Sequence, residues 1–450
     1  MALPRGQPPP SLWPPLCLLL LLLLFISSPP PLQARPLLLH PSINVAVVFS
    51  GSSYQNEVRG RLSGENFVDL PVVVSPVTVL VNDTNPRDLL TRLCDTMATE
   101  RLHGVVFEDD VGSGAGAQVA EVSQILDFLS TQTTLPIVGI SGGSAVVIPY
   151  KAEGSSFLQM GASLEQQILC MFKLMEEYDW GEFAVITSLL PGYDTFVDIV
   201  ESYTDTSYFL WNLQDILTLE MSVGANDART KRMLQQVDSS VLLAYCSYEE
   251  AQYLFTQAAE VGLLGPGYIW ILPSLAVGNP DSPPPVSFPV GVIGVITDQW
   301  RKSLRQRVRE GVAIVAKGAE SFKKQYGFIP EGHGDCNKPA KQSVNNTLFR
   351  HMLNVTWERK DLSFNNQGFL SNPSMIIVAL DRERLWDKVG KHMLGDLRSA
   401  TCLASHGQLL EHVFDDRHLT VATLERSILV MVECGTRALA CVRNTSSCRR

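Results

Sequence analysis

Short apolar runs alternate along the chain with longer segments in which apolar residues recur every three or four positions. Between residues 103 and 187, the runs at 105–107, 135–140 and 183–187 are separated by two such segments. Short continuous apolar runs are typical of buried strands, and the longer spacing is typical of amphipathic helices. This alternation predicts parallel α/β layers.

The same alternation continues on both sides of this stretch. Further strands are expected at 43–49, 72–80, 216–219, 241–245, 268–272, 290–296 and 375–380. Further helices are expected after Pro86, from Pro191, between Ser247 and Gly262, from Ser303 and across 344–353. Residues 279–289 contain five prolines and predict an exposed loop. About nine strands are too many for one small sheet, so the pattern predicts a clamshell of two parallel-sheet lobes with a cleft between them.

Residues 1–34 have the order of a secretory signal. One early charge, Arg5, precedes an unbroken apolar core at 16–26, and Pro-rich sequence leads to the small residue Ala34. The apolar core is shorter than the ~20 residues that span a bilayer. A short membrane anchor is the alternative interpretation.

Cysteine and sequon usage agree with export. The chain contains nine cysteines, without the paired Cys-x2-Cys spacing of a structural zinc site. Cys170 and Cys246 lie in apolar contexts and are expected to be buried free thiols. Glycosylation sequons occur at four positions, Asn82, Asn345, Asn354 and Asn444. These sites predict a glycosylated extracellular surface.

Charge and motif spacing exclude two classes of ligand. The formal net charge of −10 argues against a nucleic-acid binder, which needs a basic face. The turn at 50–53 follows the first strand and could hold a ligand, but it lacks the Gly-x-Gly-x-x-Gly spacing of a dinucleotide site. A simple loop is the other interpretation of this turn, and no cofactor is predicted.

Two motifs raise chemical alternatives. Gly139, Ser141 and Gly143 match the Gly-x-Ser-x-Gly nucleophile pattern, but the apolar, proline-broken residues 145–149 follow where a hydrolase needs a helix. Glu108, Asp109 and Asp110 could attract a hard cation, although three adjacent carboxylates cannot all face one point. We expect the Gly-x-Ser-x-Gly motif to be only a glycine-rich strand end in the cleft. We expect the three carboxylates to be a solvated strand terminus.

A long series of segments resembles one receptor family. HGVVFEDD, ISGGSAVV, AYCS-x-EEA, GLLGPGYIWILPSL and LNVTWE-x-KDLSF occur in order. They are similar to the amino-terminal domain of NMDA-type ionotropic glutamate receptors. Within that family they look most like the type-two, glutamate-binding subunits, first the C form and then the D form. The resemblance covers about 43–391 and implies the bilobed fold of type I periplasmic binding proteins.

The resemblance implies how the mature chain is organised. A bilobed domain is expected at 35–390, with lobe 1 at about 35–160 and 298–355 and lobe 2 at about 161–297 and 356–390. Cys94 and Cys336 match the cysteine pair that ties a lobe 1 helix to a long loop. Members pair with the obligatory type-one subunit through lobe 1 and use lobe opening to control a distant channel. Glutamate binds in another domain of these receptors.

Two regulatory sites of relatives are expected to differ here. Zinc-inhibited A and B forms have a His where this chain has Ser141, and the A form has another His in the turn matching 51–53, so no metal site is predicted. The drug cleft of the B form aligns with Gln124, Ile125, Phe128, Leu190 and Glu250. An aromatic residue is expected where Leu190 stands, which argues against that class of ligand.

The C-terminal end departs from the family. Residues 391–450 are expected to be a divergent linker and the start of a missing glutamate-binding domain, with no expected partners for Cys402, Cys434, Cys441 and Cys448. The predicted function is a non-enzymatic receptor ectodomain at the outer face of the postsynaptic membrane, or a secreted product if the chain is truncated. A secreted small-ligand-binding protein of the same fold and an extracellular hydrolase are the alternatives.

Overall fold

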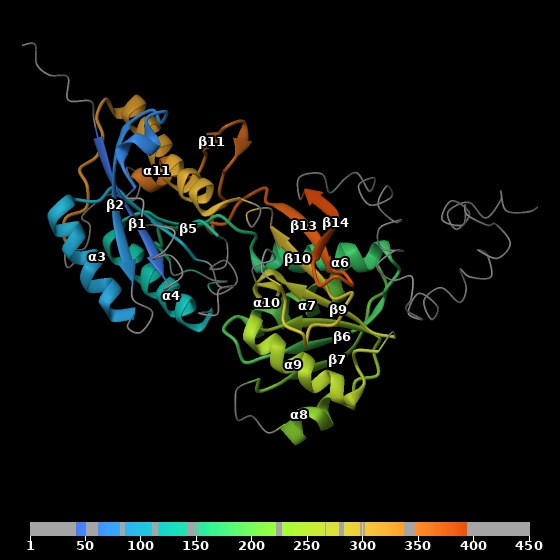
Figure 1. Cartoon of the computed structure of the whole chain (residues 1–450). Coiled ribbons are helices and arrows are strands. Elements are labelled where there is room, and N and C mark those ends of the chain that lie inside the picture. Colours follow the sequence, from blue (N-terminus) through green and yellow to red (C-terminus); the bar gives the residue numbers. More distant parts are fainter. Residues whose placement is uncertain are drawn as a thin grey trace, which may run out of the picture. The chain divides into compact units, whose positions relative to one another are not determined.

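The computed structural model describes residues 42–50, 62–81, 86–109, 116–141, 148, 151, 153–221, 227–265, 267–278, 283–297, 299, 302–336 and 347–393 (Figure 1). The predicted signal segment, the turn at 50–53 apart from the backbone of Ser50, and residues 394–450 lie outside this part of the chain. Among the described helices, none combines the length and the apolar character needed to cross a membrane.

The first lobe is built on a five-stranded parallel sheet with the order β2-β1-β3-β4-β5. Its strands are β1 (Ser42–Ser50), β2 (Val73–Val81), β3 (Gly104–Phe107), β4 (Ile137–Gly139) and β5 (Phe157–Gln159). The helices are α3 (Pro86–Glu100), α4 (Gly116–Thr133), α11 (Leu304–Tyr326) and α12 (Leu348–Met352). A short 3₁₀ helix, η1 (Gly64–Phe67), precedes β2.

Alternation along β1 explains why helices cover both faces of this sheet. Ala46 and Val48 pack with side chains of α3 and α4, whereas Val45 and Val47 pack with side chains of α11. Successive side chains of a strand point to opposite faces. A strand with a continuous apolar run is therefore buried on both sides, as residues 45–49 of the expected strand predict.

The second lobe is built on a seven-stranded sheet with the order β14-β13-β10-β9-β8-β6-β7. The parallel strands are β6 (Glu182–Thr187), β7 (Asn212–Thr218), β8 (Val241–Tyr245), β9 (Ile269–Pro273) and β10 (Ile293–Thr297). Its helices are α6 (Leu164–Glu177), α7 (Tyr193–Thr206), α8 (Asp227–Leu234), α9 (Tyr248–Val261) and α10 (Ser274–Val277). The predicted α/β class with two parallel-sheet lobes is confirmed.

An antiparallel hairpin ends the second sheet, which the sequence did not predict. β13 (Ser374–Leu380) runs antiparallel to β10, and β14 (Trp386–Met393) runs antiparallel to β13. The loop expected to be exposed at 279–289 is partly buried, because Phe288 is only 1 % exposed. Its ring packs against Phe255 and Trp386, and Arg384 donates to the Phe288 carbonyl at 2.7 Å.

Helix ends follow local cap chemistry. Ser163, Ser247 and Ser303 each cap a helix with a reciprocal Gln or Glu three residues later. Gly262 ends α9 and Gly327 ends α11, with φ of 85° and 84°. Glycine adopts this left-handed conformation without a side-chain clash. The predicted ends of the helix at 248–261 are therefore confirmed.

The chain returns to the second lobe later than the sequence indicated. A small hairpin, β11 (Thr356–Trp357) and β12 (Lys360–Asp361), lies beside α11. Leu362, Phe364 and Leu370 belong to the same apolar cluster as the buried residues of α11. The expected boundary near residue 356 is therefore wrong, and residues 356–370 belong with the first lobe.

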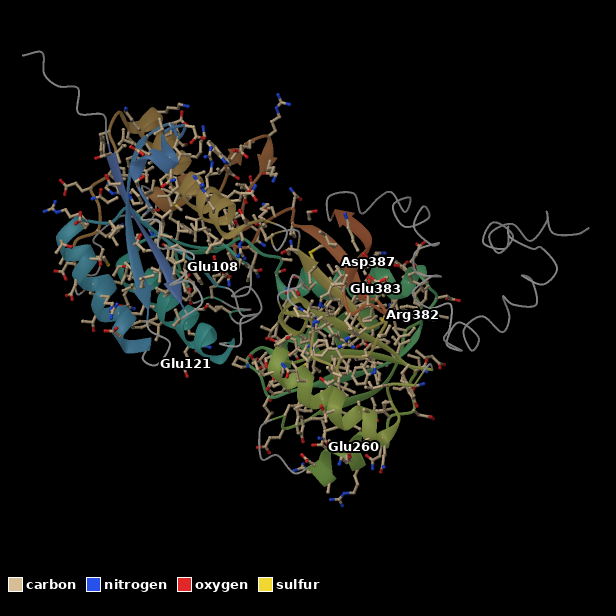
Figure 2. All side chains as sticks on the ribbon, viewed as in Figure 1. Glu108, Glu121, Glu260, Arg382, Glu383 and Asp387 are labelled. Atoms are coloured by element: carbon tan, nitrogen blue, oxygen red, sulfur yellow. A yellow bond between two sulfur atoms is a disulfide. The ribbon has the colours of Figure 1, made fainter. Side chains whose placement is uncertain are left out.

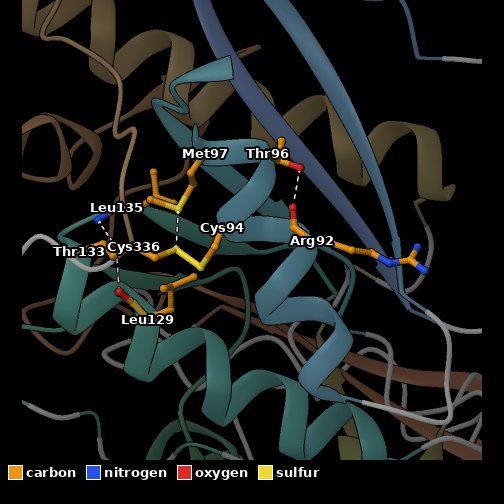
Figure 3. Close-up of a disulfide and its surroundings, with 8 residues drawn as sticks. All are labelled: Arg92, Cys94, Thr96, Met97, Leu129, Thr133, Leu135 and Cys336. Carbon is orange, nitrogen blue, oxygen red and sulfur yellow. Dashed lines mark hydrogen bonds between the residues drawn. A yellow bond between two sulfur atoms is a disulfide. The ribbon is translucent and has the colours of Figure 1, made fainter. Parts of the chain in front are cut away.

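A disulfide fastens a distant loop to the first lobe. Cys94 of α3 is bonded to Cys336, as the resemblance implied, and the two lie 242 residues apart in sequence. Figure 3 shows the bridge beside Met97 and Leu129. Leu102 and His333 also exchange backbone hydrogen bonds of 2.9 and 2.6 Å. The segment 333–336, called here the strap, is thus held by one covalent and two backbone contacts.

Removing this bridge should destabilise the fold. Replacing Cys94 and Cys336 together by Ser releases a long loop in the unfolded chain, and the loop-entropy model gives a loss of up to ~5 kcal/mol in the free energy of unfolding. Urea titration followed by circular dichroism measures the loss. Reductant should shift the wild-type midpoint toward that of the variant and leave the variant unchanged. A wild-type midpoint indifferent to reductant would contradict the prediction.

His333, the first residue of the strap, has a second histidine, His103, as its neighbour. The backbone N–H of Asn44 donates to His103 Nδ1 at 3.1 Å. Burial lowers the pKa of His103, against the effect of its backbone hydrogen bonds. Burial, with a smaller contribution from the neighbouring His103, lowers the pKa of His333 to about 4. The nearest exposed ion pair is formed by Arg101 and Glu331 at 3.7 Å.

The pKa of His333 predicts acid sensitivity of the fold. Because the folded-state pKa is depressed, the unfolded chain binds this proton first as the pH falls. The free energy of unfolding should therefore decrease from about pH 6.5 down to about pH 4 and lose no more from this group below that. Urea titrations across this range measure the slope. His333→Gln should flatten it, and an unchanged slope would show that His333 is not its source.

Candidate functional site

Four polar residues meet beyond the carboxyl ends of two strands of the first sheet. Glu108 and Asp109 directly follow β3, and Ser141 follows β4. Arg307 comes from the first turn of α11. Parallel α/β sheets bind ligands at this end of their strands. These residues, called here the strand-end cluster, form the candidate site, and Glu108 is labelled in Figure 2.

Ser141 lies at the centre of the cluster. Its hydroxyl donates to Glu108 Oε1 at 2.5 Å, and its backbone N–H donates to Asp109 Oδ1 at 2.5 Å. Arg307 Nη1 donates to Ser141 Oγ at 2.8 Å, and Arg307 Nη2 lies 3.3 Å from Glu108 Oε1. The side chains of Arg307 and Glu108 are 13 % and 0 % exposed. The cluster is a buried ion pair bridged by a hydroxyl.

The expectation of a solvated strand terminus is wrong. Glu108 and Asp109 are both fully buried, while Asp110 lies outside the described residues. A buried carboxylate is costly unless a charge and hydrogen bonds compensate it. Arg307 and Ser141 supply that compensation for Glu108. The Arg307 guanidinium thus neutralises the carboxylate, which a bound metal cation could otherwise have done.

The geometry around Ser141 does not favour a nucleophile. An activated serine needs a base free to take its proton. The hydroxyl here is held between the Glu108 carboxylate and the Arg307 guanidinium, and these two groups also form an ion pair with each other. Residues 142–147, where a hydrolase would begin its helix, lie outside the described residues.

The described residues do not bring metal ligands together. No group of three or more His, Cys, Asp or Glu side chains in this part of the chain could hold a metal ion. The strand-end cluster offers no imidazole or thiolate, which zinc prefers, and its guanidinium would repel a cation. The turn at 51–53 lies outside the described residues.

Three of the residues expected to align with a drug cleft share one face of α4. Gln124 is exposed, Phe128 is 63 % exposed and Ile125 is half-buried. The opposite side of the helix buries Val122, Leu126 and Leu129 against the sheet. Phe128 is four positions from Gln124 and three from Ile125, and residues at these separations share a helix face. The face formed by Gln124, Ile125 and Phe128 is called here the α4 face.

The other two residues expected at that cleft, Leu190 and Glu250, support the second sheet. Glu250 Oε2 accepts hydrogen bonds of 2.8 Å from Ser188 Oγ and from the Ser247 backbone N–H. Ser188 Oγ in turn accepts from the Leu190 N–H at 3.2 Å, and Leu190 packs on the core. Glu250 therefore caps α9 and fixes the segment after β6. These residues belong to a different sheet from the α4 face.

One predicted glycosylation site can be placed. Asn354 is exposed, and Thr356 of the same sequon is exposed as well. Asn82, Asn345 and Asn444 lie outside the described residues. An accessible sequon in an exported chain can be glycosylated, so Asn354 remains a predicted site.

Sequence reasoning missed two largely buried basic side chains. Arg307 lies beside the apolar stripe of α11, and no pattern in the sequence indicates that its side chain contacts the Glu108 carboxylate. Lys151 Nζ donates to the carbonyls of Phe157 at 2.5 Å and Gly368 at 3.1 Å, and it lies 4.6 Å from the centroid of the Phe369 ring. Burial lowers the pKa of Lys151 to about 7, against the attraction of Asp127.

Comparison with known proteins places the chain in a family. The model for the receptor family ligand binding region matches residues 111–383. The chain belongs to this family. This match agrees with the bilobed periplasmic-binding-protein-like fold expected from the sequence.

The chain is similar to the amino-terminal region of type-two NMDA receptor subunits. It is 49 % identical over 419 residues to glutamate receptor ionotropic, NMDA 2C of Homo sapiens, covering 91 % of this chain and 33 % of the relative. It is 40 % identical over 430 residues to NMDA 2D of Mus musculus, covering 92 % and 31 %. The chain therefore spans about a third of the length of these relatives. The expected order, C form before D form, is confirmed.

Removing the internal cation should leave a buried charge without its partner. We expect Arg307→Met to lower the free energy of unfolding by about 3–5 kcal/mol, because the Glu108 carboxylate would then be a buried charge without a partner. The double variant Arg307→Met with Glu108→Gln should lose much less, because no uncompensated charge remains. Denaturant titration of the three proteins measures both effects.

Arg309 provides a matched control on the same helix. It pairs with Asp69, but the two side chains are 38 % and 47 % exposed. Exposed pairs contribute about 0–1 kcal/mol, so Arg309→Met should change the free energy of unfolding little. Equal losses for Arg307→Met and Arg309→Met would contradict the importance of the strand-end cluster.

Proposed function

We propose that this chain forms the extracellular amino-terminal domain of an NMDA-type glutamate receptor subunit and pairs with a type-one subunit through its first lobe. The similarity to type-two subunits supports the receptor class. The single observation that supports pairing is Phe128, a large apolar side chain 63 % exposed on a helix whose other side is buried. Exposed aromatic residues are enriched at the centres of protein interfaces.

The α4 face has the chemistry of a pairing surface. Phe128 supplies apolar area, half-buried Ile125 extends it toward the core, and Gln124 supplies amide hydrogen-bonding groups beside it. Because a regular helix carries these side chains, little conformational entropy is lost when they are covered. Ordered packing of α4 on β4 and β5 keeps the face rigid.

Control of gating is the second part of the proposal. The chain passes between the two sheets after β5, after β10 and again before β13. Segments that link two lobes can act as a hinge. A partner held on the first lobe could then sense the position of the second. The function is non-enzymatic, in keeping with relatives that are receptor subunits.

Association with the type-one amino-terminal domain tests the proposal. Light scattering of the glycosylated, secreted chain mixed with that domain should give a one-to-one heterodimer, and zinc should not change it. Phe128→Ser should weaken the heterodimer at least about tenfold, which corresponds to ~1.4 kcal/mol. Both partners remain folded in this experiment, because Phe128 faces solvent.

Val68→Ser is the matched control. Val68 is 79 % exposed and also belongs to the first lobe, but it lies outside α4. Its replacement should leave the affinity unchanged. A chain that stays monomeric with the type-one domain contradicts the pairing role. If that monomer also retains an amino acid after purification, a secreted small-ligand-binding protein becomes the better interpretation.

A further inference from the structure

Two large apolar side chains in the second lobe are exposed two positions apart in the sequence. Tyr208 is 106 % exposed and Leu210 is 94 % exposed, on the segment that joins α7 to β7. Single exposed apolar residues are ordinary. Here two large ones lie two positions apart, and the residues between and after them are turned inward. We call Tyr208 and Leu210 the α7–β7 knob.

The inward side chains hold the knob in place. The Phe209 and Trp211 rings lie with centroids 4.3 Å apart, and Trp211 packs at 4.8 Å against Phe172 of α6. The Asn212 N–H donates to the Gly181 carbonyl at 2.8 Å. The knob is therefore presented on an anchored segment, which lowers the entropy cost of binding through it.

The turn at Gly181, before β6, lies close to the backbone of the knob. A Cβ at Gly181 would lie 3.1 Å from the Leu210 carbonyl oxygen. The turn before β6 and the knob are thus packed backbone to backbone. This contact brings the exposed carboxylates of Asp179 and Glu182 to the same edge of the sheet as the knob.

The segment that carries the knob is strongly acidic. Between Lys173 and Arg229 the sequence has eleven Asp and Glu residues and no Lys, Arg or His, whereas the whole chain has a net charge of −10. The excess negative charge of the chain is therefore concentrated in this segment. Glu201 and Asp205, near the end of α7, and Asp215, on the edge strand β7, are all exposed.

We propose that the α7–β7 knob is a docking site for a protein surface that offers an apolar hollow rimmed by Lys and Arg side chains. Complementary charge steers association and suppresses wrong partners, and burial of Tyr208 and Leu210 supplies affinity. A second copy of this face would bring two acidic surfaces together, and an anionic membrane would repel it. A basic, apolar protein surface is the occupant that satisfies both features.

A pair of designed peptides tests this proposal on the full chain. The probes are two amphipathic helical peptides with the same apolar positions, one with Lys and one with Glu at every polar position. Tryptophan fluorescence, to which Trp211 beside Phe209 contributes, and calorimetry report binding. The Lys peptide should bind, the Glu peptide should not, and salt should weaken the complex.

Variants separate docking from simple charge attraction. Tyr208→Ser with Leu210→Ser keeps every acidic residue and should weaken binding of the Lys peptide at least about tenfold. Val286→Ser with Leu385→Ser, at positions 94 % and 57 % exposed elsewhere in the second lobe, is the control and should have no effect. Circular dichroism checks that all variants are folded.

Three outcomes would overturn the proposal. Equal affinity of the knob variant and the wild type would show that only charge is recognised. Equal affinity of the Lys and Glu peptides would show that the acidic surroundings play no part. Absence of binding by either peptide would show that the knob is no docking site. None of these outcomes bears on pairing through the α4 face.

Discussion

The first lobe depends on a helix that the chain supplies only after it has built most of the second lobe. α11 covers the face of the first sheet that α3 and α4 leave open, and its buried side chains join those of β1 in one cluster. The contact is close because two glycines permit it. A Cβ at Gly311 would lie 2.6 Å from an Ile140 methyl carbon, and one at Gly104 would lie 3.0 Å from a Val315 methyl carbon. Such non-local packing cannot form until the second lobe has been synthesised.

Charge burial follows from the same arrangement. Once α11 lies on the sheet, its first turn covers the ends of β3 and β4, and the carboxylate of Glu108 loses access to water. Arg307, in the first turn of the helix, compensates this buried charge by its hydrogen bond to Ser141 and its ion pair with Glu108. The cluster thus fixes the start of α11 over the strand ends. Its hydrogen-bonding groups serve the fold, and a ligand at this place would have to displace an internal cation.

The sequence predicted the elements whose apolar period is long and uninterrupted. Helices α9 and α11 and the strands β1, β8 and β10 fall within a few residues of their expected positions, because burial on defined faces imposes a clear period. The three-residue strand β5 and the hairpin of β11 and β12 are too short to show one. The burial of Glu108 could not be predicted, because it depends on a helix almost 200 residues away in sequence. Arg307 was missed for the same reason.

The distribution of exposed apolar groups is the basis of both proposed recognition surfaces. Ligand sites in parallel α/β proteins usually lie at the strand ends, where polar groups are free to bind the ligand. Here the polar side chains of the strand-end cluster are hydrogen-bonded to one another. Phe128 and the pair Tyr208 and Leu210 are instead large, exposed and held by inward neighbours on ordered elements. They lie on different lobes, and carboxylates accompany both: Glu121 is exposed seven positions before Phe128 on α4, and Glu201, Asp205 and Asp215 flank the pair in sequence. Because the two surfaces share no residues, a partner that covers Phe128 would leave Tyr208 and Leu210 exposed, so a single domain could bind two neighbours without competition for the same side chains.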